Sequence, residues 1–82
     1  MDEQGIKDII VVLSELEGDS TIPRNVKQKI TIIISILKEP AEISIKIDKA
    51  LQELDEVTDD NNLQPHVRTQ IWNIVSMLEK SF

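Results

Sequence analysis

The stretch Val26-Lys-Gln-Lys-Ile30-Thr-Ile-Ile33-Ile34-Ser-Ile-Leu37 decides between two fold classes. Most of its apolar residues recur at spacings of three and four, which places them on one face of an α-helix. That face consists of Val26, Ile30, Ile33, Ile34 and Leu37. The spacing therefore predicts an amphipathic helix over residues 23–38.

A β-hairpin is the competing interpretation of this region. Residues 31–37 are rich in β-branched side chains, and isoleucines alternate with polar residues over residues 43–47, which is a strand pattern. A turn at Glu39-Pro40 would join the two strands. The helical interpretation is favoured because its spacing continues beyond both segments, whereas the alternation covers only about five residues.

Three further segments show the same helical spacing, between breaks at residues 18–20, at Pro40 and at residues 59–62. The expected inward residues are Ile6, Ile9, Ile10, Leu13 and Leu16 in the first, Ile43, Ile47, Ala50, Leu51, Leu54 and Val57 in the third, and Val67, Ile71, Ile74, Val75 and Leu78 in the fourth. The predicted helices are 3–17, 23–38, 41–57 and 65–80. We therefore predict an all-α fold, a four-helix up-and-down antiparallel bundle that forms one domain over residues 1–82.

The two halves of the chain resemble each other. The segment Leu13-Ser-Glu-Leu16 aligns with Leu51-Gln-Glu-Leu54, and prolines begin the second helix of each half. Further correspondences pair Pro23 with Pro65, Ile30 with Trp72, Ile33 with Val75 and Ile36 with Leu78. The bundle is therefore expected to consist of two similar αα-hairpins.

Composition excludes several classes of function. Fifteen acids and nine bases give a net charge of −6, which disfavours binding to DNA and docking on an anionic membrane. The chain has no cysteine, so neither a disulfide framework nor a thiolate metal site is expected. Its acidic start does not fit a signal peptide, and no apolar run approaches the roughly 20 residues of a membrane span. We expect a cytoplasmic protein.

Two segments carry a family resemblance. Gly18-Asp-Ser-Thr-Ile-Pro-Arg-Asn-Val26 and His66-Val-Arg-Thr-Gln-Ile-Trp-Asn-Ile-Val-Ser-Met-Leu-Glu79 resemble the signature segments of an archaeal family of small proteins, Uncharacterised Protein Family 0147. The resemblance covers nearly the whole chain. It implies a compact helical bundle in an archaeal cytoplasm, and it implies no activity.

Acidic residues are expected to gather at the end of the bundle that holds the first and third loops. The region from Asp55 to Asn62 has oxygen-ligand spacing, but it lacks the glycine and the glutamate that an EF-hand loop requires. We favour a surface charge network over a cation site. His66 is the only histidine and has no cysteine partner, so we expect no catalytic residue, no metal site and no cofactor.

One basic cluster is a candidate site for contact with RNA or the ribosome. It consists of Arg24, Asn25, Lys27 and Lys29, with Arg68 at the same end of the bundle. Intramolecular pairing with nearby carboxylates is the favoured interpretation, since no aromatic platform for bases accompanies the cluster.

Several apolar residues fall outside the inward faces. Ile32 and Ile45 lie opposite them, Ile36 lies on a flank, and Trp72 fits either the core or an interface. Neighbouring helices carry Ile32 and Ile45, so these side chains are expected to form one patch. The leading hypothesis is a non-enzymatic module that forms a homodimer or binds a protein partner.

Overall fold

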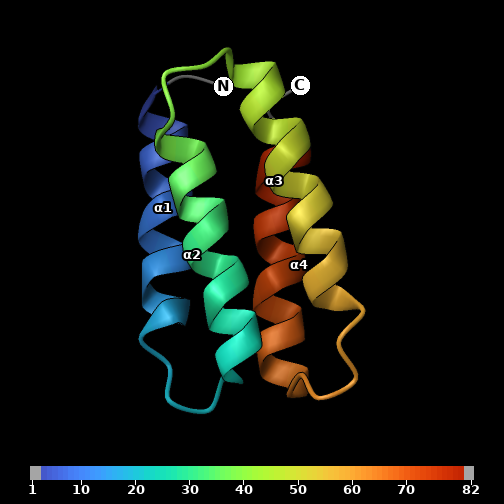
Figure 1. Cartoon of the computed structure of the whole chain (residues 1–82). Helices are drawn as coiled ribbons and strands as arrows, with labels where there is room; N and C mark the ends of the chain where they lie inside the picture. The colour runs from blue at the N-terminus through green and yellow to red at the C-terminus, as the bar shows by residue number, and fades with distance from the viewer. Residues whose placement is uncertain (1–2, 81–82) are drawn as a thin grey trace.

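The computed structural model describes residues 3–80, which form four α-helices and contain no strand (Figure 1). The helices are α1 (Glu3–Glu17), α2 (Arg24–Lys38), α3 (Ile43–Thr58) and α4 (Pro65–Glu79). The predicted all-α fold is confirmed. The competing β-hairpin is excluded, because residues 31–37 and 43–47 are helical.

The helices run up and down (Figure 1). They enclose one hydrophobic core. Each helix packs against the next one in sequence, and α1 also packs against α4. The diagonal pairs make no close backbone contact within the described residues, and the contact between α1 and α4 is the least extensive. The connections 18–23 and 59–64 share one end of the bundle, which we call the loop pole (Figure 1). Residues 39–42 cross the opposite end, which we call the linker pole.

Prolines set the limits of several helices. A residue before proline is driven into an extended conformation, and both Glu39 and Gln64 adopt it. Glu39 therefore ends α2, and α3 begins at residue 43, two residues later than predicted. Pro65 is the first residue of α4, where its missing N–H is tolerated. Pro23 instead precedes the first residue of α2.

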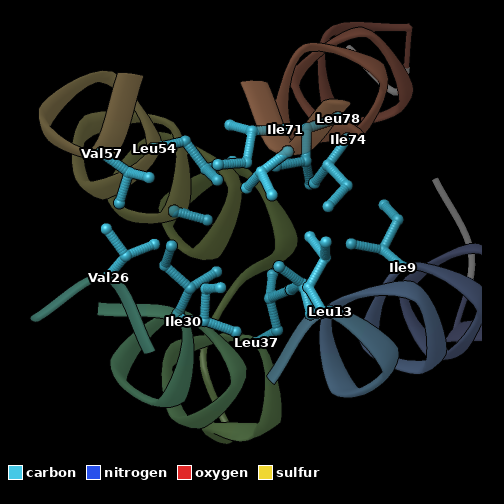
Figure 2. Close-up of a cluster of buried hydrophobic side chains, with 14 of the residues drawn as sticks. Ile9, Leu13, Val26, Ile30, Leu37, Leu54, Val57, Ile71, Ile74 and Leu78 are labelled. Carbon is cyan, nitrogen blue, oxygen red and sulfur yellow. The ribbon is translucent and has the colours of Figure 1, made fainter. Parts of the chain in front are cut away.

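The core consists only of aliphatic side chains (Figure 2). Eighteen of them are buried within residues 3–80, and no polar side chain there is buried. Five residues expected to point inward are only partly buried and pack against this core: Ile10, Ile34, Ile43, Leu51 and Val75. Two loop residues complete the core at the loop pole and were not expected there. Ile22 and Leu63 each lie just before the residue that caps the next helix, and both are buried.

The core repeats itself at a constant separation of 41 residues, the difference between Leu13 and Leu54. The eighteen buried residues form nine such pairs: Ile6 with Ile47, Ile9 with Ala50, Leu13 with Leu54, Leu16 with Val57, Ile22 with Leu63, Val26 with Val67, Ile30 with Ile71, Ile33 with Ile74 and Leu37 with Leu78. We call the residue 41 positions away in the other hairpin the counterpart. The bundle is thus two equivalent αα-hairpins that share one core.

The correspondences expected from sequence need correction. They aligned Pro23 with Pro65, which are 42 residues apart, but these prolines occupy different positions at their helix starts. The alignment consequently matched the buried Ile30 with Trp72, which is exposed. The match between residues 13–16 and 51–54 is also wrong, because Leu51 lies on the flank of α3.

Candidate interaction surface and charged poles

One large apolar side chain on each helix points to solvent in the described part of the chain. Val11 on α1 is 56% exposed, Ile32 on α2 and Ile45 on α3 are each 45% exposed, and Trp72 on α4 is 55% exposed. Ile32 and Ile45 thus lie where the helical spacing put them. Trp72, which fitted either the core or an interface, lies outside the core. Ile36 is half-buried.

Ion pairs show on which side of α2 and of α3 these residues lie. Lys29 of α2 pairs with Glu53 of α3, so this flank of α2 faces α3. Residues at separations of three, four and seven share a helical side, which places Ile32 and Ile36 on the same flank.

The corresponding flank of α3 is marked by Lys49, which pairs with Glu39 just beyond the end of α2. Ile45 lies one turn before Lys49 and therefore faces outward on the same side. We call Ile32, Ile36 and Ile45 the α2–α3 apolar surface. Val11 lies on α1 and does not belong to it.

Trp72 lies on the side of α4 that faces α3. Arg68, one turn earlier, donates hydrogen bonds to backbone carbonyls at the end of α3, which marks that side. Trp72 therefore lies on the α3–α4 face of the bundle and is separate from the α2–α3 apolar surface.

The exposed apolar residues do not follow the 41-residue repeat of the core. The counterpart of Ile32 is Asn73, that of Ile45 is Gln4, and that of Trp72 is Thr31. The counterpart of Val11 is Gln52. Polar residues therefore occupy the same positions in the other hairpin, and the bundle does not require apolar ones there.

Polar and charged side chains of the loop pole link the two hairpins. Asn25 at the start of α2 donates a hydrogen bond of 2.8 Å to the Asp60 carboxylate in the other hairpin. Its counterpart His66, at the start of α4, has Nε2 at 3.7 Å from the Asp19 carboxylate in the first hairpin. The two contacts are equivalent under the repeat, and each crosses between hairpins. Both contacts therefore join the two hairpins at the loop pole.

Backbone contacts of the same two carboxylates shape the loops. The Thr21 N–H donates to Asp19 Oδ1 and the Asn62 N–H donates to Asp60 Oδ1, each at 2.8 Å. The Thr21 hydroxyl and N–H lower the pKa of Asp19, and the Asn62 N–H and Asn25 side chain lower the pKa of Asp60. Both loops therefore use an ionised aspartate to close a turn.

The basic cluster divides into engaged and unpaired residues. Lys29 Nζ contacts Glu53 at 2.7 Å and also pairs with Glu56. Hydrogen bonds to these carboxylates raise the pKa of Lys29, and the bond from Lys29 lowers that of Glu56.

Arg68 donates to the Thr58 carbonyl at 2.6 Å and to the Asp60 carbonyl at 3.0 Å, and so caps the end of α3. Arg24 and Lys27 make no ion pair within residues 3–80. Of the five residues predicted as a cluster, the structure thus commits three to internal contacts.

Neither a metal cluster nor a membrane-spanning helix occurs in the part of the chain that the structure describes. No three His, Asp or Glu side chains there lie close enough together to hold a metal ion. This includes the acids from Asp55 to Asp60. No described helix is both long and apolar enough to cross a bilayer.

The sequence did not predict a hollow at the linker pole. It has a volume of about 400 Å³ and is lined by residues of three helices: Ile6, Lys7, Ile10, Leu37, Lys38 and Lys46. No local motif brings these positions together. The charge pattern of the single helices gives no signal of it, because only the antiparallel packing places the three lysines at one end.

Comparisons with known proteins agree with this architecture. The model of a family described as "Uncharacterised protein family (UPF0147)" matches residues 1–81. A UPF0147 protein of Archaeoglobus fulgidus is 35% identical over 98% of this chain and 92% of its own length. UPF0147 protein MJ1419 of Methanocaldococcus jannaschii is 38% identical over 95% of this chain and 85% of its own. A solved structure, "Crystal structure of unknown function protein MMP1188", is 36% identical, with a TM-score of 0.91 over 96% of this chain and 91% of that one.

Proposed function

The chain belongs to the uncharacterised protein family UPF0147, and on that premise we propose that it is a non-enzymatic interaction module that associates with a second copy of itself. The resemblance seen in the sequence is confirmed, and the relatives that carry the family name come from archaea. The family description assigns no activity, so the proposal is based on the surface of the molecule. The site that we propose is the α2–α3 apolar surface.

The observation that carries this proposal is the contrast between a repeated core and an unrepeated surface. Ile32 and Ile45 are each 45% exposed, yet their counterparts Asn73 and Gln4 are polar. Exposed branched aliphatic side chains cost free energy in water at about 25 cal/mol per Å² of apolar area. Since the fold accepts polar residues at these positions, burial against another molecule accounts for the apolar ones.

The surroundings of the surface support a protein interface. The Lys49–Glu39 ion pair lies on the same flank, with nitrogen and oxygen 3.8 Å apart and both side chains about half exposed. Protein interfaces commonly have an apolar centre within a polar rim. The molecule is 32 Å long and 19 Å wide, so a standard interface of roughly 800 Å² per partner would occupy at least one whole long face.

Light scattering over a concentration series tests the proposal. The wild type is expected to form a dimer in the high micromolar range. Ile32→Glu and Ile45→Glu are each expected to shift it towards the monomer, because a carboxylate would be buried without a partner. Val11→Glu adds the same charge on α1, outside the surface, and serves as the control.

A wild type that stays monomeric throughout the series would count against self-association. A dimer weakened equally by Val11→Glu would place the interface elsewhere. The helical circular dichroism signal of each variant shows whether the bundle remains folded.

Contact with RNA is the alternative, and it has less support. Lys29 and Arg68 are engaged in internal contacts, which leaves Arg24 and Lys27 as the free bases of the cluster within the described residues. The alternative predicts RNA binding that weakens steeply with salt and falls on Arg24→Ala. Binding indifferent to that substitution would remove its basis.

A further inference from the structure

The hollow at the linker pole concentrates positive charge in an acidic protein. Three of the nine bases line it, although the chain has a net charge of −6. No Asp or Glu is among the lining residues. Within residues 3–80, none of Lys7, Lys38 and Lys46 lies within ion-pairing distance of a carboxylate. These ammonium groups are therefore available to a ligand.

Favourable interaction with the partial charge of a helix end does not explain the positions of two of these lysines. Lys7 lies near the N-terminus of α1, and Lys46 lies in the first turn of α3. The N-terminus of a helix carries a partial positive charge, which disfavours a cation there. Only Lys38, in the last turn of α2, has the sign that its helix end favours. An anion in the hollow would relieve the repulsion at the other two positions.

The repeat shows that the fold does not require this charge. The counterpart of Lys7 is Asp48, and that of Lys38 is Glu79, so acids occupy the equivalent positions in the second hairpin. The apolar floor, by contrast, is retained in kind. Ile6, Ile10 and Leu37 correspond to Ile47, Leu51 and Leu78. Packing thus accounts for the floor. The basic rim, formed by Lys7 and Lys38 of the first hairpin and Lys46 of the second, is a separate feature.

We propose that this hollow binds a small amphipathic anion, namely a carboxylate or phosphate monoester on a short apolar chain. The chain would lie on Ile6, Ile10 and Leu37, while the lysines would contact the anionic group. A volume of about 400 Å³ is within the usual range for small-molecule sites. The proposal is independent of self-association, because no lining residue belongs to the α2–α3 apolar surface.

Titration with octyl phosphate, followed by the amide signals of the ¹⁵N-labelled full chain, tests this proposal. Saturable shifts are expected at Ile6, Ile10 and Leu37. Octanoate tests a carboxylate on a similar chain, and octyl glucoside tests a neutral head group. The triple variant Lys7→Gln, Lys38→Gln, Lys46→Gln is expected to weaken octyl phosphate binding about thirtyfold, which is about threefold for each exposed charge pair.

The matched control is Arg24→Gln, Lys27→Gln, Lys80→Gln, which removes the same charge from positions outside the hollow. It is expected to bind octyl phosphate with nearly the wild-type dissociation constant. The site is overturned if octyl phosphate gives no saturable shift, if octyl glucoside binds equally well, or if both triple variants lose affinity to the same degree. Circular dichroism of both variants establishes that the helices are intact.

Discussion

Single residues of the core have equal roles in the two hairpins. Leu13 and Leu54 are both fully buried and are counterparts, whereas Leu51 lies on a flank and only packs against the core. This distinction was beyond the sequence, because both Leu51 and Leu54 fit the helical spacing of their segment. Only the packing of the four antiparallel helices determines that Leu54, and not Leu51, is fully buried.

Leucine truncations test this equivalence. Leu13→Ala and Leu54→Ala are each expected to lower the free energy of unfolding by about 2–5 kcal/mol, because each leaves a cavity in a tightly packed interior. Leu51→Ala is expected to cost less, since part of its side chain already contacts water. Urea denaturation of the three variants measures the difference. If Leu51→Ala lowered the free energy of unfolding as much as Leu54→Ala, the assignment of Leu54 to the core and Leu51 to the flank of α3 would be contradicted.

The aspartates that close the loops predict how stability depends on pH. Folding lowers the pKa of Asp60 below its ordinary value of 3.8, so the folded chain binds this proton less readily than the unfolded chain. The stability that Asp60 contributes is thus present above 3.8 and is lost as the pH falls through its folded pKa. The same sign holds for Asp19.

Denaturation at neutral pH and below 3.8 measures this effect. Asp60→Asn keeps one oxygen, which can accept the Asn62 N–H hydrogen bond, but it loses the second oxygen, which accepts from the Asn25 side chain. Because the amide cannot titrate, the stability of this variant is expected to fall less in acid than that of the wild type. Asp59→Asn, at an exposed neighbouring position, is the control and is expected to retain the wild-type dependence. An Asp60→Asn variant as acid-sensitive as the wild type would refute this role.

At the scale of helices and connections, periodicity predicted most of the architecture. The four helices agree with their predicted limits to within about two residues, a usual margin at helix ends. Residues 31–37 form helix despite their β-branched side chains, because burial of the Ile30, Ile33 and Leu37 face outweighs the small propensity penalty. The buried Ile22 and Leu63 were missed, since they lie in connections where no helical period applies.

The end of α3 depends on a side chain from α4. Arg68 donates to the carbonyl of Thr58, the last residue of α3, and to the carbonyl of Asp60 just beyond it, which also accepts from the Leu63 N–H. Arg68→Ala is expected to lower the free energy of unfolding by about 1–3 kcal/mol, the usual range for hydrogen bonds to a charged group. Arg68→Lys is expected to recover only part of this loss. Its single ammonium group replaces a planar guanidinium group that donates from two nitrogens to two carbonyls.

Hydrogen exchange at the end of α3 provides the readout specific to this contact. Amides of residues 55–58 are expected to lose protection in Arg68→Ala more than those of α1 do. Uniform loss of protection over both helices would show that Arg68 acts on the whole fold and not on this helix end.

At the scale of the whole molecule, the core and the surface follow different rules. The nine core pairs maintain two equivalent hairpins, and the cross-links at the loop pole follow the same repeat. The features that depart from it are the outward apolar residues and the basic hollow. The sequence identified Ile32 and Ile45 because helical phase alone separates outward from inward positions. It could not identify the hollow, which forms only when three helices meet.

Sedimentation equilibrium of a variant that restores the repeat on the surface tests self-association through Ile32 and Ile45. In Ile32→Asn, Ile45→Gln, each apolar residue is replaced by its own counterpart, so the bundle is expected to keep its helicity and its unfolding midpoint. The wild type is expected to have a mass near twice 9.3 kDa at high micromolar concentration, and the variant a mass near 9.3 kDa. Equal masses for the two proteins, or a variant that no longer folds, would contradict this expectation.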